Sequence, residues 1–487
     1  MSAPAPAGDP SAPTSPGPFL GPLLLALMAC ELLQLFSPGR FAELGTQVLV
    51  LATPLLGFTR LRLREFYLLG IALVLLALAL YRLPDAAETI ERGLERASFL
   101  AAFILLMGLL REGGITSPAV RDCGTYITRQ PPQRRFLAVF MGSHFFSVLI
   151  NLGALSLLAP IILRGVRGDK STGEALDEIG RVRERRQLSA LLRGFAWFLV
   201  WAPTAVTQAI LPTLIPGIET GRLLVTGLAV AFVMLLVSWL EDMLRWWPLR
   251  RRLRNSGQMP ETGGQAFPGP AFFRLGCISA LLLGLTLALS TLGSVSLVNG
   301  VMLAAPLVLM VWVFAQQGGH SATAKLRGSL VRLGAITTGN LPSFVREAVS
   351  LGAAGFIGTL AARLIPADQV ASALSVEQMP GWLFLFGLSA FVWLGGQIAL
   401  SPITTAVFLG SLVADLGIIP VSPTLAALAI AAGTAICTTG APFASGTLML
   451  ARASGHSGIE LAWKWNLPYT LVAMAVLALI YAGLTAF

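Results

Sequence analysis

Charged residues are scarce in this chain. Asp, Glu, Lys and Arg make up 12% of its 487 residues, and apolar residues make up 55%. Soluble domains carry about 25% charged residues. The mean hydropathy of +0.76 points the same way. The composition therefore excludes an ordinary soluble domain and predicts an all-α polytopic membrane protein.

Residues for metal, redox and ATP chemistry are also scarce. The three histidines are widely separated, and Cys30, Cys123, Cys277 and Cys437 lack metal-ligand spacing. A Walker lysine motif and a paired-carboxylate motif are both missing. We therefore expect no enzyme activity, no metal site and no cofactor, with Na+ as a coupling ion the exception. An integral-membrane transferase is the least favoured alternative.

The positive charge is concentrated in a few loops. The formal net charge is +10, and most Lys and Arg residues fall between apolar runs. Loops rich in Lys and Arg are typical of the cytoplasmic side of a membrane. We therefore expect the lipid bilayer, and not nucleic acid, to be the partner that this charge reflects.

The basic loops give a topology. Residues 1–18 are rich in Pro, Ala and Ser, lack Lys and Arg, and predict a disordered tail. Residues 19–40 contain the first span, and the later runs bring the total to about eleven spans. The N-terminus is then cytoplasmic and the C-terminus external, in a cell membrane of the bacterial inner-membrane type.

Two apolar runs are too long for single spans and are interrupted in the middle. Residues 136–163 would form a helix of about 42 Å, against a hydrocarbon core of about 30 Å. Basic residues flank this run at both ends, which predicts a re-entrant hairpin turning near Asn151 and Gly153. The second run, residues 382–413, has no basic flank and predicts a hairpin entering from outside. Two long tilted helices are the alternative.

Each hairpin precedes a span broken by proline, so the chain contains a repeat. Residues 41–254 and 271–487 are the predicted repeats, joined by a cytoplasmic linker over 255–270. Their broken helices cover 195–215 and 424–450. An A-P-x-A pattern begins at Ala202 and recurs from Ala441. An odd number of crossings separates the repeats, so they face opposite ways, as in many secondary transporters.

The hairpin tips and broken spans resemble those of the ion transporter superfamily. That group includes divalent-anion/sodium symporters, arsenite permeases and some sodium/proton antiporters, and the resemblance covers residues 41–487. In the symporters each tip carries a Ser-Asn-Thr motif. Here the first tip keeps only Asn151, and the second, Ser401 to Thr405, keeps hydroxyls without the Asn. This departure argues against a dicarboxylate substrate and sodium coupling. The resemblance implies a homodimer and an elevator mechanism.

Small polar residues at the tips and breaks form the predicted substrate site. Half-helix N-termini suit an anion and unwound carbonyls suit a cation. A small anion fits this site, and a neutral polar solute fits it nearly as well. The alternative is that Ser and Thr only join helices. The predicted substrate-binding residues are Asn151, Gly153, Thr204, Thr207, Gln208, Ser401, Pro402, Thr404, Thr405, Thr438, Thr439 and Pro442.

Ion coupling is assigned to residues of the same hairpins. The candidates are His144, Ser147, Asn151 and Ser401. A histidine titrates near neutral pH, so His144 would favour protons, unless it only bonds a neighbour. The predicted function is secondary active transport of a small, anionic solute coupled to Na+ or H+. A sodium/proton antiporter or a small-metabolite exporter of the same fold is the alternative.

Overall fold

The computed structural model describes residues 19–37, 39–168, 176–256, 266–293, 295–318 and 321–486. Over these residues the chain is helical, with no strand. The predicted tail, residues 1–18, lies outside the described residues, and so does most of the predicted linker (257–265). The first long helices are α1 (Leu20–Gln34), α2 (Arg40–Leu56), α3 (Leu63–Arg82) and α4 (Ala86–Ile115).

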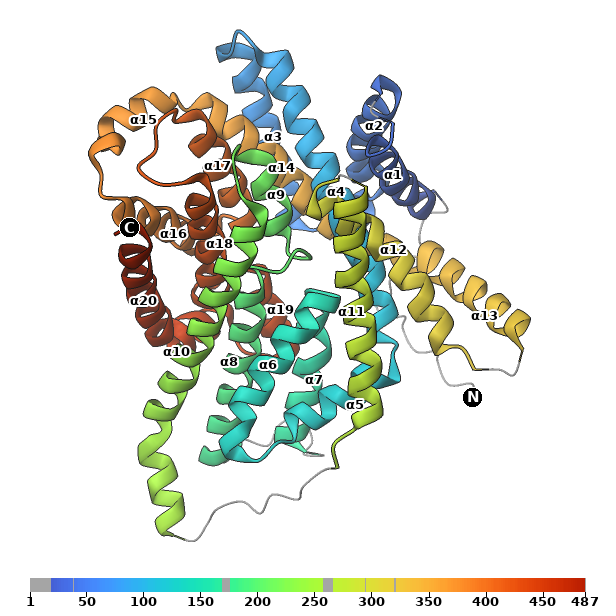
Figure 1. Cartoon of the computed structure of the whole chain (residues 1–487), viewed down its shortest axis with the longest axis vertical. Coiled ribbons are helices and arrows are strands. Elements are labelled where there is room, and N and C mark those ends of the chain that lie inside the picture. Colours follow the sequence, from blue (N-terminus) through green and yellow to red (C-terminus); the bar gives the residue numbers. More distant parts are fainter. Residues whose placement is uncertain are drawn as a thin grey trace, which may run out of the picture.

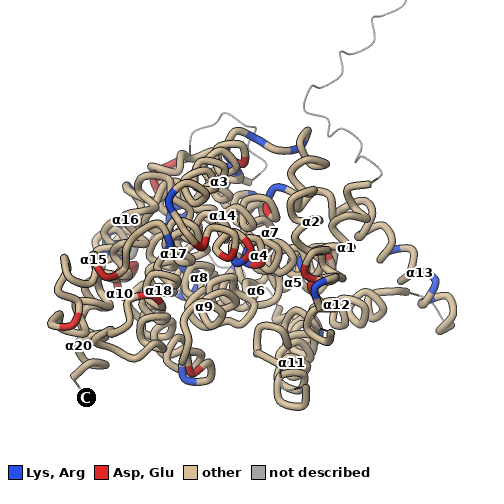
Figure 2. The backbone as a smooth tube through the Cα atoms, turned by 90° about the horizontal axis from the view of Figure 1, so that it is seen from above, with Lys and Arg blue, Asp and Glu red and all other residues tan. Residues whose placement is uncertain are grey.

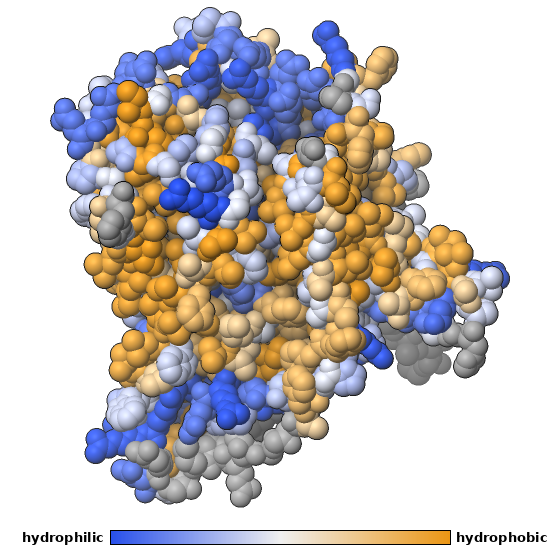
Figure 3. Space-filling model, viewed as in Figure 1, coloured by the Kyte–Doolittle hydropathy of each residue, from blue (hydrophilic) through white to orange (hydrophobic). Residues whose placement is uncertain are grey.

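Helices long and apolar enough to cross a bilayer dominate the structure. Within the described residues, eight helices have the length and apolar composition to cross a membrane. Figure 3 shows the apolar side chains as a belt between two hydrophilic ends. The helices differ in burial: the most apolar stretch of Pro423–Ser454 is fully buried, whereas 17% of that in α3 is buried. The chain is therefore a multi-pass membrane protein with a helical interior shielded from lipid.

The first hairpin consists of α6 (Pro132–Ile150) and α7 (Gly153–Arg167). The two helices meet at Asn151 and Leu152, where the sequence predicted a turn. Asn151 has φ +48°, a conformation that Asn tolerates better than most residues. The other ends of both helices lie at the lower end of the molecule, beside α5 (Pro118–Thr128) (Figure 1).

The second hairpin consists of α16 (Gly381–Gln397) and α17 (Pro402–Asp415). Its tip contains Ala399, which has φ +66°. The hairpin is preceded by α15 (Ala367–Leu374), which lies at the upper end in Figure 1, opposite α5. The segments leading into the two hairpins therefore lie at opposite ends of the molecule.

Each hairpin is followed by a broken helix. The first consists of α8 (Glu178–Phe198) and α9 (Val206–Leu214), and the second of α18 (Pro423–Gly440) and α19 (Ser445–Ser454). The charged first half of α8 runs without interruption into its apolar half. Glu184 is buried there because Arg167 pairs with it.

Close backbone contacts join each hairpin to its broken helix. A Cβ at Gly194 of α8 would lie 2.3 Å from the carbonyl oxygen of Phe140 in α6. A Cβ at Gly433 of α18 would lie 2.9 Å from that of Ser389 in α16. Ser143 Oγ and Ser389 Oγ each donate a 2.7 Å hydrogen bond to a carbonyl of the broken helix. Glycine is required at both contacts, since any side chain would collide with backbone.

The remaining helices surround these two units. The long helices α4 and α14 (Val345–Leu364) lie side by side, and α17 packs on α14 (Figure 1). Figure 2 shows the molecule from above, with α4, α6 and α9 near the middle and α11, α13 and α20 toward the edge. The other elements are α10 (Thr220–Asn255), α11 (Gly269–Leu292), α12 (Leu297–Gln316), α13 (Ala322–Ala335), α14 (Val345–Leu364) and α20 (Leu467–Thr485), with short turns of 3-10 or π helix at Phe58–Arg60, Ile336–Asn340, Leu341–Phe344, Val376–Gln378 and Glu460–Asn466.

Candidate functional site

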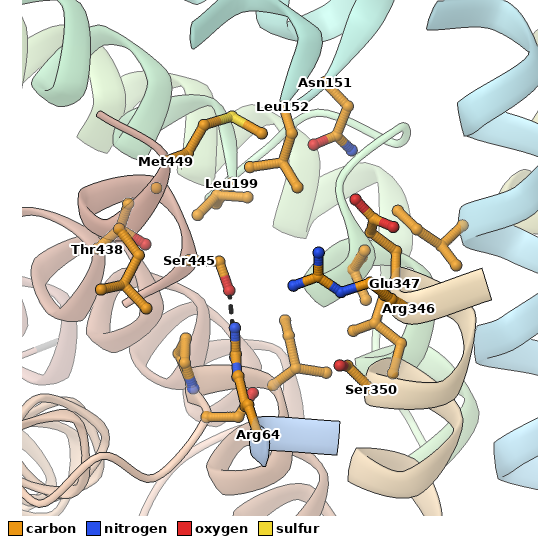
Figure 4. A pocket seen from close by; sticks show the side chains of 18 of the residues that line it. Arg64, Asn151, Leu152, Leu199, Arg346, Glu347, Ser350, Thr438, Ser445 and Met449 are labelled. Carbon is orange, nitrogen blue, oxygen red and sulfur yellow. Dashed lines mark hydrogen bonds between the residues drawn. The ribbon is translucent and has the colours of Figure 1, made fainter. Parts of the chain in front are cut away.

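A cavity of about 190 Å3 lies where the two hairpin tips meet. Asn151 and Leu152 reach it from the first tip, and Ser401 and Pro402 reach it from the second. The second broken helix contributes Thr438, Ser445 and Gly446 on either side of its break. Figure 4 shows Asn151, Thr438 and Ser445 around this space. The structure therefore brings together tips that lie 250 residues apart in the chain (401 minus 151).

The first tip is fastened to the first broken helix. Asn151 is 8% exposed, and its Nδ2 donates to the carbonyl oxygen of Thr204 at 3.1 Å. Thr204 Oγ1 donates in return to the carbonyl oxygen of Val148 at 2.9 Å. These two bonds satisfy carbonyls that the interrupted helices leave without helical partners. Thr204 thus holds the tip from behind and does not line the cavity.

Thr207 and Gln208 stabilise the break itself. Thr207 Oγ1 donates to the carbonyl oxygen of Leu199 at 2.8 Å, and Gln208 Nε2 donates to that of Val200 at 2.6 Å. Both carbonyls lie in the unwound segment after α8, where a buried polar group without a partner would be costly. The two side chains were predicted to bind substrate, but the structure commits them to the backbone.

In the second broken helix, only part of the predicted set faces the cavity. Thr438 lines it, although its Oγ1 also donates to the carbonyl oxygen of Thr434 at 2.8 Å. Thr439 Oγ1 donates to the carbonyl oxygen of Ile436 at 3.0 Å within its own helix. The carbonyl of Pro442 lies against Gly458, where a Cβ would approach it to 2.4 Å. Thr439 and Pro442 therefore lie away from the cavity.

The second tip contains an unused hydroxyl. Thr404 Oγ1 is buried and has no hydrogen-bond partner among the described residues. Thr405 Oγ1 donates to the carbonyl oxygen of Ser401 at 3.1 Å, closing the first turn of α17. Gly153, predicted at the first tip, faces the aliphatic part of Arg111 instead of the cavity. Thr404 therefore has a buried hydroxyl without a partner in the described part of the chain, although it is not among the residues that line the cavity.

Charged residues line the cavity, whereas all of the predicted substrate-binding residues are neutral. Arg64 of α3, Arg346 of α14 and Arg452 of α19 reach it, together with Glu65 and Glu347. Figure 4 shows the guanidinium groups of Arg64 and Arg346 pointing into the same space. Three arginines against two glutamates leave an excess of positive charge, which favours an anionic solute.

The arginines differ in how firmly they are held. Arg346 Nε lies 3.4 Å from Glu65 Oε2, and Arg64 Nη2 lies 3.5 Å from Ser445 Oγ. Arg452 has no ion-pair partner within the described part of the chain, and its side chain is exposed. In sequence, Arg64 and Arg452 belong to basic segments that mark one side of the membrane, and this obscured their second role. The signal in the sequence that could have pointed to this role was the pair of adjacent charged residues, Arg64 and Glu65, at a helix start.

The residues predicted for ion coupling divide into two groups. Asn151 and Ser401 line the cavity. His144 lies between α6 and α8, where Trp201 Nε1 donates to its Nε2 at 2.8 Å and Gly194 O lies 3.1 Å from its Nδ1. Ser147 Oγ donates to the carbonyl oxygen of Ser143 at 2.6 Å. Both ring nitrogens of His144 are thus engaged. Among the residues described, no group of three His, Cys, Asp or Glu could hold a metal ion.

The comparisons with known proteins concern the fold. No family model matches the sequence, and no curated protein matches it. The structure is similar to the Alcanivorax borkumensis YdaH transporter, described as having an unusual topology, with a TM-score of 0.52 and 13% identity over 86% of this chain and 97% of that one. It is also similar to Neisseria gonorrhoeae MtrF, described among antimetabolite efflux pumps, with a TM-score of 0.51 and 14% identity over 86% and 94% of the two chains.

At these identities the likeness shows the fold alone. Both similar structures are membrane transporters, which agrees with the transporter prediction at the level of architecture. Membership of the ion transporter superfamily stays a prediction. The chain is a multi-pass membrane protein with the fold of a membrane transporter.

Proposed function

We propose that the protein is a secondary active transporter for a small anionic solute. The observation that carries this proposal is the convergence of Arg64, Arg346 and Arg452 with both hairpin tips on one cavity. Arginine side chains bind carboxylate and phosphate groups through paired hydrogen bonds. An anion in this cavity would contact the tips as well as the arginines. Its position could therefore control how the hairpins move.

We propose further that transport follows an elevator mechanism in a homodimer. Two hairpins approached from opposite ends of the molecule, each followed by a broken helix, support an inverted repeat over residues 41–254 and 271–487. In the proposed orientation the N-terminus is cytoplasmic, the C-terminus is external, and the membrane is the inner membrane of a bacterium. The basic lower end of the molecule would then face the cytoplasm.

The coupling ion in this proposal is Na+ or H+. Glu65 and Glu347 at the cavity are carboxylates that a proton or a sodium ion could neutralise. Glu65 is buried and already accepts hydrogen bonds from the Arg62 backbone at 2.8 Å and from Ser350 at 3.3 Å. The free hydroxyl of Thr404 is a further oxygen for a cation or a solute. These groups, more than His144, are the coupling candidates that the geometry favours.

An exporter of a small metabolite is the second candidate. The likeness to MtrF, described among antimetabolite efflux pumps, is the observation that favours it. The same cavity would serve export if the coupling ion and the solute crossed the membrane in opposite directions. A sodium/proton antiporter has less support, because the stretches around the two breaks, residues 195–215 and 424–450, contain no acidic residue. A membrane transferase has less support still, since the two solved structures named above are transporters.

Transport in proteoliposomes tests the proposal. Purified protein would be reconstituted and offered a panel of organic and inorganic anions and neutral polar solutes, with sodium and proton gradients imposed separately and in both directions. We expect an anion to be concentrated under one of these gradients. Arg452→Gln should raise its KM about tenfold or more, since hydrogen bonds to charged groups contribute about 1.5–3 kcal/mol.

The matched control is Arg121→Gln, which removes an exposed arginine outside the cavity. It should leave the KM unchanged. Transport of neutral solutes alone, with equal rates in Arg452→Gln and the native protein, would contradict the anion assignment. Movement of no solute under any gradient would contradict transport itself.

A further inference from the structure

A second cavity, far from the hairpin tips, lies at the basic end of the molecule. Its volume is about 560 Å3, and it is bounded by the starts of α6 and α8 and by the end of α10. In Figure 1 these helix ends lie together at the lower end of the structure. The arginines in its wall are Arg134, Arg135, Arg183, Arg186, Arg250 and Arg251.

The positive charge of this cavity is poorly balanced. Asp242 pairs with Arg186 at 2.7 Å and with Arg250 at 3.2 Å, so one carboxylate serves two guanidiniums. Arg134, Arg183 and Arg251 have no carboxylate partner in the described ranges, and no acidic residue lines the cavity there. Burial, together with the nearby Arg183 and Arg186, lowers the pKa of Arg135 to about 10. The cavity therefore holds positive charge that the protein does not neutralise.

Polar atoms inside the wall also lack partners. Gln187 of α8 is 2% exposed, and neither its Nε2 nor its Oε1 forms a hydrogen bond with any described residue. The Nε of Arg183, one turn earlier, is buried and equally without a partner. Buried polar groups are rarely left unsatisfied in native proteins, and each that is requires an explanation. A bound group with acceptor oxygens would supply the missing partner to Arg183 and Gln187.

The rest of the wall is apolar and continues onto the lipid-facing surface. Trp239 and Trp247 are 37% and 57% exposed, and tryptophan is typical of the membrane interface. Leu137 on α6 lines the cavity, and Leu240 and Leu244 are exposed on the neighbouring α10. A free phosphate would have no use for these apolar surfaces, whereas acyl chains would cover them.

We propose that this cavity binds the headgroup of an anionic phospholipid, with the phosphate near Arg134, Arg183, Gln187 and Arg251 and the acyl chains along α6 and α10. Basic pockets between helices on the cytoplasmic side are suited to such headgroups. The lipid would join the start of the first hairpin to α10. The site is separate from the transport cavity, and the proposal does not depend on which solute is carried.

Lipid binding to the detergent-purified full chain tests this assignment. Native mass spectrometry would compare phosphatidylglycerol with phosphatidylcholine of the same acyl chains. Each basic residue near an anionic lipid contributes a factor of roughly five to affinity. We therefore expect tighter binding of phosphatidylglycerol, and a loss of about tenfold or more in the Arg134→Ala/Arg183→Ala/Arg251→Ala variant. That variant leaves the ion pairs of Asp242 intact.

The matched control removes three exposed arginines elsewhere: Arg121→Ala/Arg129→Ala/Arg164→Ala. It should keep the native preference for phosphatidylglycerol. Gln187→Met is a gentler second variant that removes the unpartnered amide at similar volume, and it should weaken phosphatidylglycerol binding severalfold with little effect on phosphatidylcholine. Equal losses in both triple variants would show a general surface-charge effect and overturn the proposal.

Competition with inorganic phosphate distinguishes a phospholipid headgroup from a free phosphate ion, since both carry the same phosphate group. Added at millimolar concentration to the native protein, it should not displace phosphatidylglycerol, because it lacks the acyl-chain contacts. Full displacement would assign the site to a soluble anion and overturn the lipid assignment. Unchanged phosphatidylglycerol binding in Gln187→Met together with the cavity triple variant would overturn the site altogether.

Discussion

The two hairpin units are built alike but are held in place differently. The first unit, α6 to α9, is surrounded by ion pairs, which join Arg167 to Glu184 and Arg193 to Glu241. The second unit, α16 to α19, is almost free of charge: from Gly381 to Ser454 its charged residues are Asp415 and Arg452. Its links are neutral hydrogen bonds, such as Ser389 with Tyr481 at 2.8 Å and Gln397 with the Gly440 carbonyl at 3.1 Å.

The two hairpin tips also differ in how firmly the protein holds them. Asn151 and Thr204 tie the first tip to its broken helix by two hydrogen bonds. At the second tip Ile398 is 74% exposed, and the Thr404 hydroxyl has no partner in the part of the chain that is described. The comparison indicates that the first tip is held by hydrogen bonds within the protein, whereas the second tip has a polar group that is free to bind a solute or an ion. The following predictions test this contrast in order of expected effect.

The largest effect is expected at Asn151. Asn151→Ala leaves the Thr204 carbonyl without its donor and places alanine at φ +48°. Losing such a buried partner costs about 1–3 kcal/mol. We expect transport to fall about tenfold or more while the expressed protein stays monodisperse on size-exclusion chromatography.

Asn151→Gly separates the backbone from the side chain, because glycine accepts the positive φ. If the amide matters, this variant is as inactive as Asn151→Ala. Recovery of the native transport rate in Asn151→Gly would reduce the first tip to a turn and remove the contrast with the second.

A smaller effect is expected at the second tip. Thr404→Val keeps the volume of the side chain and removes its unpartnered hydroxyl. We expect the KM for the solute or for the coupling ion to rise severalfold, with thermal stability unchanged or increased, since no protein hydrogen bond is lost.

Thr439→Val is the matched control in the second unit. Its hydroxyl is equally buried but bonds a carbonyl of its own helix. It should cost some stability and leave the KM unaltered. Equal kinetic effects of the two variants would show that Thr404 has no special role in binding.

A pH effect is expected where the units are joined. His456, between α19 and the π turn Glu460–Asn466, contacts Glu184 Oε1 through Nε2 at 2.8 Å and Glu460 through Nδ1 at 3.1 Å. The hydrogen bond to Glu184 raises the pKa of His456 above its ordinary value of 6.5, against burial, and Glu460 raises it further. The stabilisation is therefore complete below pH 6.5 and is lost as the pH rises through the raised pKa.

Thermal unfolding of the detergent-purified protein from about pH 6 to about pH 9 measures this loss. The native Tm should decline by a few degrees over that interval, and the decline should be smaller in His456→Gln. A pH profile that the substitution does not change would show that this link does not hold the units together.

The smallest effect is expected at Ala399. Its φ of +66° costs an alanine about 1 kcal/mol, and glycine removes that cost while adding unfolded-state entropy of similar size. Ala399→Gly should therefore change the free energy of unfolding by no more than about 0.5 kcal/mol and leave transport intact. A transport defect as large as that of Asn151→Gly would mean that both tips depend on their own side chains.

Local features of the sequence anticipated the local features of the fold. The turn at Asn151, the tip before Ser401 and the breaks after Phe198 and Gly440 all follow from small, polar or proline residues inside apolar runs. The role of each polar side chain did not follow, because sequence does not show whether Thr207 meets a carbonyl or a solute. Arg346 could not be foreseen either, since its place at the cavity depends on how α14 packs against distant helices.

The glycine contacts between hairpin and broken helix limit how this protein can change shape. At Gly194 and Gly433 the backbones touch so closely that one helix cannot slide past the other without collision. A hairpin that moves must then carry its broken helix with it. Sliding between helices is then confined to interfaces outside these hairpin–broken-helix pairs, where side chains and not backbones are in contact.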